Sequence, residues 1–286
     1  MKIIEKYESI ALMKNPINIG VGLGDSEYDN QKIIKISLDF VKKHKSKVYF
    51  FGKHQFSNKL PRIIPEPMDK ELQFINTRSP GASIFEFLNN NVIHAIVRGS
   101  IGSSEFLKYF KLNLKVKEFN RLALLETYNG QQFFFGPVGI DECNNFKKKV
   151  NFLELAINEL RILEILPNIS ILSGGRLSDA GRDAKVDKTL REAEKIVKVL
   201  KGNHPNLKIS HDEILIEKAI KNKSNLIIAP DGISGNLIYR TLVHLGGGKA
   251  FGAIYMGNFK KIIIDTSRVG DTSEIFGALI LAKALS

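Results

Sequence analysis

The sequence has little of what stabilises a small secreted domain or crosses a membrane. Its 286 residues include one cysteine, Cys143, and no tryptophan. A single cysteine excludes a disulfide framework within the chain and fits a reducing compartment. The best apolar run, Ile275 to Leu285, contains Lys283 and is shorter than the ~18 residues of a membrane span. Because the first residues also lack the apolar segment of a signal peptide, we expect a cytoplasmic protein with no membrane partner.

The charge is strongly basic, with 42 Lys and Arg against 30 Asp and Glu, a formal net charge of +12. The lysines are scattered, and two groups, at 42–47 and 147–149, lie at the ends of expected helices, where they suit the solvated surface. No aromatic-interleaved basic motif or nucleic-acid module accompanies them, so we do not expect a nucleic-acid partner. A basic cleft for a small phosphorylated ligand explains the charge as well.

Apolar residues make up 43% of the chain, which is ordinary for a globular protein, and expected strands and helices alternate along it. That alternation predicts an α/β fold with a mainly parallel sheet covered on both faces. The expected strands are Ile17–Val21, Val48–Phe51, Val92–Val97, Ile169–Leu172, Leu226–Ala229 and Ile262–Ile264. The expected helices are Glu27–His44, Ser83–Asn90, Ser103–Phe110, Phe146–Ile165, Asp187–Lys201 and Asp212–Asn222.

One segment interrupts the alternation. Residues 121–136 form two apolar runs on either side of Asn129-Gly130, a pair typical of a type I′ hairpin turn. An antiparallel hairpin in a parallel context predicts mixed, mostly parallel sheets.

Two strand-to-helix turns near the C-terminus predict an anion site. The first reads Gly232-Ile233-Ser234-Gly235-Asn236, before a helix expected at Leu237 to Leu245. The second reads Asp265-Thr266-Ser267-Arg268-Val269-Gly270-Asp271 and opens the last helix. The first amides of a helix are unpaired and its dipole favours negative charge, and an arginine can bind phosphate through two nitrogens.

Two further turns offer similar chemistry. Ser173-Gly174-Gly175-Arg176 follows an expected strand, and its glycines allow the backbone to approach a ligand closely. Arg98-Gly99-Ser100 precedes a helix, where the serines could cap the helix or bind an anion. Arg98 has two interpretations, since it either points into a cleft or pairs with an acid.

These motifs resemble a known family. The pattern Pro230-Asp231-x-x-Ser234-Gly235-Asn236-x-x-Tyr239-Arg240, then Gly246-Gly247, then Asp265-x-Ser267-Arg268, resembles the signature of the phosphate acetyltransferase/butyryltransferase superfamily. The likeness extends from about Val92 to the C-terminus. Within the superfamily the chain is most similar to the methanogenesis marker protein 4 (MtxX) branch, which carries a methyltransferase-related label.

The resemblance implies a two-lobed, three-layer α/β/α fold of the isocitrate/isopropylmalate dehydrogenase type. The first lobe would be residues 1–137 plus 258–286 and the second 138–257, with a ligand in the cleft between them. Family members pair through the second lobe, so we expect a homodimer. The helices at 146–165 and 187–201 offer apolar faces for it, at Phe152, Leu155, Leu160 and Leu163.

The resemblance also implies the site. Ser267, Arg268 and Glu274 would be catalytic, and the ligand would contact Ser100, Ser173, Gly174, Gly175, Arg176, Gly235 and Asn236. In this family a carboxylate deprotonates the thiol of coenzyme A for attack on an acyl phosphate, and the arginine neutralises phosphate charge. Glu274 stands where the family has an aspartate, and Asp271 is either an alternative base or a helix cap. Coenzyme A or an acyl phosphate would be a substrate, with no tightly bound cofactor.

A second departure leaves other functions open. The family's Asp-Gly-Pro/Glu-Leu-x-x-Asp turn is replaced by His211-Asp212-Glu213-Ile214-Leu215-Ile216-Glu217, which puts acyl transfer in doubt and favours a non-catalytic ligand-binding or assembly protein for methyl-transfer machinery. A third alternative is an S-adenosylmethionine methyltransferase. The segment Gly20-Val21-Gly22-Leu23-Gly24 imitates the glycine loop of such enzymes. The next strand ends without the acid that would hold a ribose, so we predict no tight adenosine site there. No histidine or cysteine has metal-ligand spacing.

Overall fold

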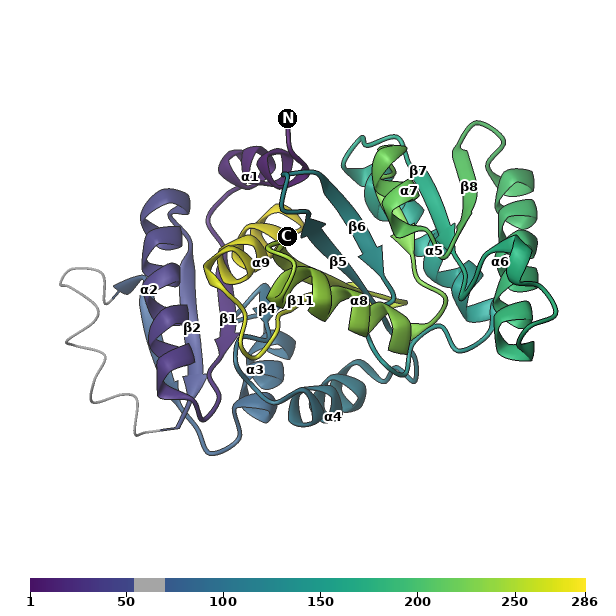
Figure 1. The fold of residues 1–286 in the computed structure, drawn as a ribbon. Coiled ribbons are helices and arrows are strands. Elements are labelled where there is room, and N and C mark those ends of the chain that lie inside the picture. The colour runs from purple at the N-terminus through teal and green to yellow at the C-terminus, as the bar shows by residue number, and fades with distance from the viewer. Residues whose placement is uncertain (54–69) are drawn as a thin grey trace. The chain divides into compact units, whose positions relative to one another are not determined.

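The structure, a computed structural model, describes residues 1–53 and 70–286 (Figure 1). Contacts between Cα atoms group these residues into two compact units. The first comprises Ile3–Glu118 and Ala250–Ser286, and the second comprises Phe119–Lys249 together with Lys2. The hairpin, which the sequence analysis assigned to the first lobe, is grouped here with the second unit. The lobe boundaries implied by the resemblance stay a prediction.

The first unit is built on a mostly parallel sheet with strand order β3-β2-β1-β4-β11-β10, in which only the β10–β11 pair is antiparallel. The helices α1, α2 and α9 pack against one another, α3 packs on α4, and both α3 and α9 contact β1. The elements are α1 (Ile3–Met13), β1 (Asn18–Gly22), α2 (Glu27–His44), β2 (Lys47–Gly52), β3 (Leu72–Asn76), α3 (Pro80–Asn89), β4 (Ala95–Val97), α4 (Ser103–Leu114), β10 (Lys249–Met256), β11 (Ile262–Asp265) and α9 (Thr272–Ala284).

The apolar run at the C-terminus forms the centre of this unit. Helix α9 is apolar on all sides, and nearly all of it is buried against α1, α2 and the sheet (yellow in Figure 1). Gly277 lets the strand β10 approach, because a Cβ at this position would lie 2.6 Å from the Cβ of Phe251. No helix within residues 1–53 and 70–286 has the length and apolar character needed to span a membrane.

The second unit has strand order β5-β6-β9-β7-β8, with β5–β6 antiparallel and the other pairs parallel. Its elements are β5 (Asn120–Glu126), β6 (Gln132–Gly136), α5 (Phe146–Ile162), β7 (Asn168–Leu172), η3 (Leu177–Asp179), α6 (Ala184–Asn203), β8 (Lys208–Glu213), α7 (Ile216–Lys221), β9 (Leu226–Ile228) and α8 (Gly232–His244). The mixed, mostly parallel α/β class predicted from the sequence is confirmed.

The predicted hairpin is present as β5 and β6, but its turn is not of type I′. That type requires a positive φ at both central residues, whereas only Gly130 has one (+86°). The Gly130 amide donates to the Thr127 carbonyl and the Thr127 amide to the Gln131 carbonyl, so the loop is three residues long. The Thr127 hydroxyl, which contacts Asn129 and Gln131, stabilises this longer turn.

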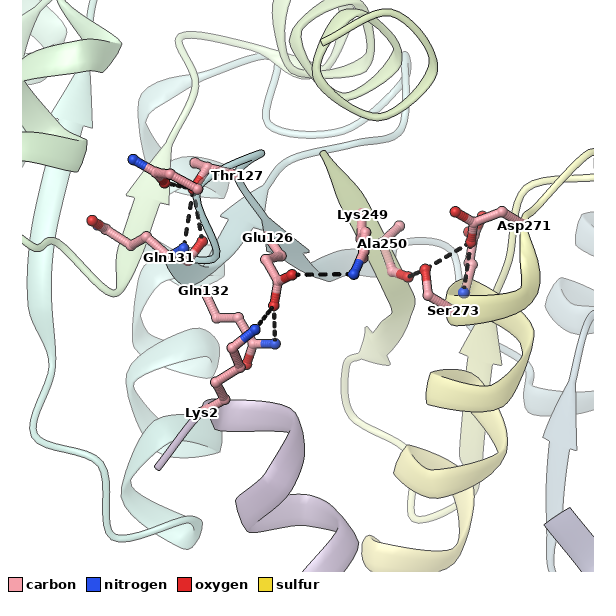
Figure 2. A network of polar contacts seen from close by, with 11 residues as sticks. Lys2, Glu126, Thr127, Gln131, Gln132, Lys249, Ala250, Asp271 and Ser273 are labelled. Atoms are coloured by element: carbon pink, nitrogen blue, oxygen red, sulfur yellow. Dashed lines mark hydrogen bonds and ion pairs between the residues drawn. The ribbon is translucent and has the colours of Figure 1, made fainter. Parts of the chain in front are cut away.

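The end of β5 carries a buried carboxylate, Glu126, held by three side chains (Figure 2). Lys2 donates to it at 2.9 Å and Gln132 at 2.8 Å, while the ammonium of Lys249 lies 3.7 Å away. Although burial opposes ionisation, the hydrogen bonds from Lys2 and Gln132 lower the pKa of Glu126. The ionised Glu126 carboxylate therefore links the end of β5 to Lys2, Gln132 and Lys249.

The segment 208–222 differs from the expected helix at 212–222. Residues Lys208–Glu213 form the edge strand β8, and only Ile216–Lys221 are helical. Charged residues are common on edge strands because they discourage pairing with other chains. Of the expected helix, only Asp212 and Glu213 lie in the edge strand, and the helix itself begins later, at Ile216.

Candidate functional site

A pocket of about 800 Å³ lies in the first unit, where the loops after β1, β2, β3, β4 and β11 meet. Open parallel sheets bind ligands at the carboxyl ends of their strands. Its charged lining residues are Lys53, Arg78, Lys108 and Arg268 against Asp25 and Glu105, and its hydroxyl groups come from Ser26, Ser79, Ser100, Ser104 and Tyr109. Four cations against two carboxylates make it a basic pocket.

Three helices begin at this pocket. The N-cap residues Ser26 of α2, Ser79 of α3 and Gly102 of α4 all belong to its lining. Each helix start presents the positive end of a helix dipole. Together with the cationic side chains, this arrangement suits a ligand with phosphate or carboxylate groups.

Ser100 lies in this pocket, as a ligand role requires, but its hydroxyl is already used. It donates to Asn30 Oδ1 at 2.6 Å and accepts from the Gly24 amide at 2.8 Å. Ser100 is 2% exposed, and a Cβ at Gly24 would lie 2.3 Å from the Ser100 carbonyl oxygen. The residue therefore joins the loop after β1 to the loop after β4.

The glycines at the end of β1 are required by packing. A Cβ at Gly20 would lie 2.5 Å from Ile93, and one at Gly22 would lie 2.1 Å from Ile101. Gly20 and Gly22 therefore allow close packing of β1 against its neighbours. The absence of an adenosine site at Gly20–Gly24 stays a prediction.

Arg98 pairs with an acid. Its Nε donates to Asp265 Oδ1, one terminal nitrogen donates to the Ile101 carbonyl at 2.9 Å, and the other to the Thr266 carbonyl. Arg98 and Asp265 are both buried. The guanidinium thus ties the loop after β4 to the loop after β11, and it holds the segment that carries Ser267 and Arg268.

That segment is shaped by Glu274, which lies in the first turn of α9 and is 3% exposed. Its Oε1 accepts from the Ser267 amide at 2.7 Å, and Asp271 caps the helix by accepting from the Glu274 amide at 2.9 Å. A Cβ at Gly270 would lie 2.7 Å from Glu274 Oε2, so the loop wraps closely around the carboxylate. Arg268 projects from the loop, is exposed and lines the pocket.

The Ser173–Arg176 turn lies in the second unit, after β7. The Ser173 hydroxyl, which is buried, bonds the Gly175 carbonyl at 3.0 Å and lies 2.9 Å from His211 Nε2. Burial lowers the pKa of His211, which favours its neutral form. The contacts of Ser173 with Gly175 and His211 thus stabilise the turn. Arg176 at the end of the turn is exposed.

Glu213 holds the same turn from the strand β8. Its carbonyl accepts from the Ser173 amide at 2.8 Å and its carboxylate from the Leu177 amide at 2.9 Å. Glu213 has φ = +61°, a conformation in which glycine is the usual residue. Glu213 thus bonds the turn through both its backbone and its side chain.

Gly235 and Asn236 are inside α8 and not before it. The helix begins at Gly232, capped by Asp231, which accepts from the Ser234 amide at 2.8 Å. The expectation that this helix starts at Leu237 was wrong, because Asp231 caps it five residues before Asn236. A Cβ at Gly235 would lie 1.9 Å from the Pro137 carbonyl, and Asn236 Nδ2 donates to the Val138 carbonyl at 2.8 Å.

The structure thus brings two of the predicted residues, Ser100 and Arg268, to one pocket. The groups at 173–176 and 235–236 lie in the second unit, and their convergence with Arg268 on one ligand stays a prediction. Sequence reasoning missed Lys53, Arg78 and Lys108. A signal existed for one of them, since Arg78-Ser79-Pro80 combines a cation with a proline at a helix start.

The remaining reactive groups do not add a second centre. Burial raises the pKa of the Cys143 thiol, and the charge of Glu142 raises it further. Within residues 1–53 and 70–286, no three His, Cys, Asp or Glu side chains are grouped as metal ligands would be.

The chain is similar in sequence to proteins of Methanosarcina species. No protein-family model matches it. It is 40% identical over 227 residues to the "Putative methyltransferase mtx subunit X" of Methanosarcina barkeri, covering 78% of this chain and 81% of that protein. The protein of the same name from Methanosarcina mazei is 43% identical over 218 residues, which is 75% of each chain.

Solved structures share the fold at low identity. A phosphotransacetylase from Streptococcus pyogenes has a TM-score of 0.73 at 16% identity, covering 99% of this chain and 98% of that chain. A branched-chain phosphotransacylase from Enterococcus faecalis has a TM-score of 0.69 at 15% identity, covering 94% and 99%. A 4-hydroxythreonine-4-phosphate dehydrogenase from Klebsiella pneumoniae has a TM-score of 0.60 at 12% identity, covering 94% and 99%.

Proposed function

Because the chain belongs to the family of the Methanosarcina mtx subunit X proteins, we propose that it is a transferase-like protein that binds a phosphorylated or coenzyme A-like ligand. The observation that carries this proposal is the basic pocket of the first unit, which joins Arg268 to three helix starts. The fold shared with phosphotransacetylases supports the same ligand class.

The proposed chemistry is transfer of an acyl group from phosphate to a thiol. The sulfur of coenzyme A forms a bond to the acyl carbon, the bond from that carbon to the phosphate oxygen breaks, and phosphate leaves. Arg268 neutralises the charge on the leaving phosphate, and Glu274 takes the thiol proton. Ser267 positions the loop through its amide contact with Glu274.

The test is a binding titration of the full chain with acetyl phosphate, coenzyme A and S-adenosylmethionine, followed by Arg268→Ala. The variant loses a charge-assisted contact, and we expect its affinity for whichever phosphorylated compound binds to fall by about 1.5–3 kcal/mol. The fold should survive, because Arg268 is exposed. Full affinity in the variant would reject the proposal. Binding of S-adenosylmethionine against Gly20–Gly24 would favour the methyltransferase alternative.

A second candidate is a non-catalytic ligand-binding or assembly protein for methyl-transfer machinery. Two observations favour it. The proposed base Glu274 is buried and bonded to its own loop, and His211 and Glu213 occupy the turn at Ser173. An assay that follows release of phosphate from acetyl phosphate separates the two candidates. Tight binding with no turnover supports the second.

We further propose that the protein is a homodimer, paired through α7 and α8. Of the four residues predicted for the interface, Phe152, Leu160 and Leu163 are at most 2% exposed and are not available for pairing. In contrast, Ile233 and Leu237 on α8 are each 61% exposed. Leu237 also lines an apolar groove of about 460 Å³, together with Ile216, Ile220, Ile238 and Leu242.

Apolar surface of this kind on one helix pair marks an association site, and a two-fold axis lets one patch cover its copy. Light scattering at tens of micromolar should give a dimer mass, and Leu237→Asp should give a monomer that remains folded. A monomeric wild-type protein would reject the pairing. A dimer that Leu237→Asp leaves intact would place the interface elsewhere.

A further inference from the structure

The start of α3 in the pocket is capped by a carboxylate from another helix. Its N-cap residue Ser79 makes no side-chain cap, because its hydroxyl donates to the Tyr109 hydroxyl at 3.1 Å. Instead, Glu105 Oε1 accepts from the Gly81 amide at 3.1 Å. Glu105 lies in the first turn of α4 and lines the pocket. An anion therefore already stands at one of the three helix starts.

The packing around this contact is specific. A Cβ at Gly81 would lie 3.1 Å from Glu105 Oε1 and 2.8 Å from Tyr109 Cδ2, so the close approach of α4 depends on glycine there. Also in the pocket lining, Asp25 accepts from Lys53 at 2.6 Å, and this hydrogen bond, with a smaller contribution from Glu105, raises the pKa of Lys53. Asp25 and Glu105 thus each accept a hydrogen bond from a donor, the Lys53 ammonium or the Gly81 amide, that a phosphate would otherwise bind.

We infer that Glu105 takes the place of one anionic group of a ligand and so determines how many phosphate groups the pocket accepts. This inference rests on the proposed function, in which Arg268 binds the leaving phosphate of an acyl phosphate in this pocket, and it concerns that phosphate group and not the diphosphate of coenzyme A. A ligand with one phosphate binds beside Arg268 and avoids Glu105. A second phosphate, directed toward the start of α3, meets a fixed negative charge and a helix start that is already filled. Glu105 is a specificity-determining residue that selects against diphosphates.

The experiment compares Glu105→Gln with the wild type by titration calorimetry, using inorganic phosphate and inorganic pyrophosphate as probes. Glutamine keeps an oxygen that can accept from the Gly81 amide, so the variant removes the charge and preserves the packing. We expect the pyrophosphate affinity to rise about tenfold, because a like charge near the second phosphate is gone, and the phosphate affinity to change less than about threefold. Glu86→Gln, an exposed acid on α3 outside the pocket lining, is the control and should change neither affinity.

The outcomes separate this inference from the proposed function. Equal gains for both probes, a loss for either, or the same gain in Glu86→Gln would overturn the role of Glu105. If Glu105→Gln binds no pyrophosphate at all, the inference is also wrong. Arg268→Ala, made in both backgrounds, tests the pocket itself. If it leaves both affinities unchanged, the proposed function fails, whereas weaker binding with no effect of Glu105→Gln removes only the inference.

Discussion

Glu274 accepts a hydrogen bond from the backbone amide of Ser267 across 2.7 Å, although seven residues separate them. The carboxylate is 3% exposed, and Asp271 holds its helix turn in place. The contact fixes the loop that presents Arg268 to the pocket. The same carboxylate is the proposed base, so Glu274 has both a structural role and a proposed chemical role.

Replacing Glu274 should separate those roles. Glu274→Ala leaves the half-buried Ser267 amide without its acceptor and should lower the free energy of unfolding by about 1–3 kcal/mol. Glu274→Gln keeps an oxygen acceptor and should lose less than about 1 kcal/mol, while any acyl transfer should disappear. Urea unfolding and a phosphate-release assay measure the two effects. Wild-type turnover in Glu274→Gln would show that the base is another group.

The buried pair of Arg98 and Asp265 should be the most sensitive polar contact of the first unit. Arg98→Ala leaves a buried carboxylate unpaired and should cost about 3–5 kcal/mol of unfolding free energy. The control is Arg268→Ala, an exposed arginine of the same unit, which should stay within about 0.5 kcal/mol of the wild type. Equal stability of the two variants in chemical denaturation would contradict the structural role assigned to Arg98.

The fold class could be predicted because it depends on periodic apolar patterns. The helix at 27–44 and the strands β1, β2, β7, β9 and β11 follow directly from them. The strands β3, β8 and β10 were missed for physical reasons. The strand β8 carries charged residues at a sheet edge, and β10 contains Gly252, whose φ of +93° interrupts a regular strand.

The candidate site was predictable only in part. Ser-Arg after a strand and a serine turn before a helix are local signals, and both Arg268 and Ser100 do line the pocket. The contributions of Lys53 and Lys108 depend on which loops the sheet order brings together, and no local pattern reports that. The contact between Glu105 and the start of α3 likewise joins two helices whose pairing only the packing reveals.

The left-handed conformation of Glu213 gives a prediction with a defined sign. Glu213→Ala and Glu213→Gly both lose the bond to the Leu177 amide, but only glycine removes the strain of φ = +61°. Glu213→Gly should therefore be more stable than Glu213→Ala by about 1 kcal/mol. At Ser210, on the same strand and without a positive φ, the order should reverse, with glycine less stable than alanine. Denaturant midpoints of the four variants check both signs, and the same order at the two positions would contradict the assigned strain.

The lowered pKa of His44 predicts how the free energy of unfolding depends on pH. The ring is buried at the end of α2, stacked on Phe40, with Glu8 at 3.8 Å. Burial, together with the charge of Lys283, lowers the pKa of His44 to about 4 from 6.5, so the folded state favours the neutral ring.

The unfolded chain takes up a proton as the pH falls through 6.5, while the folded chain takes it up only near pH 4. The stabilisation is therefore complete above pH 6.5 and is lost progressively as the pH falls toward 4. Between pH 8 and pH 5 this should cost about 2 kcal/mol of unfolding free energy in the wild type. In His44→Phe, which keeps an aromatic ring but cannot titrate, that part of the loss should vanish. Urea unfolding of both proteins across this range measures the difference, which lies above the pH at which most carboxylates titrate. Parallel pH profiles for the two proteins would show that His44 is not the group responsible.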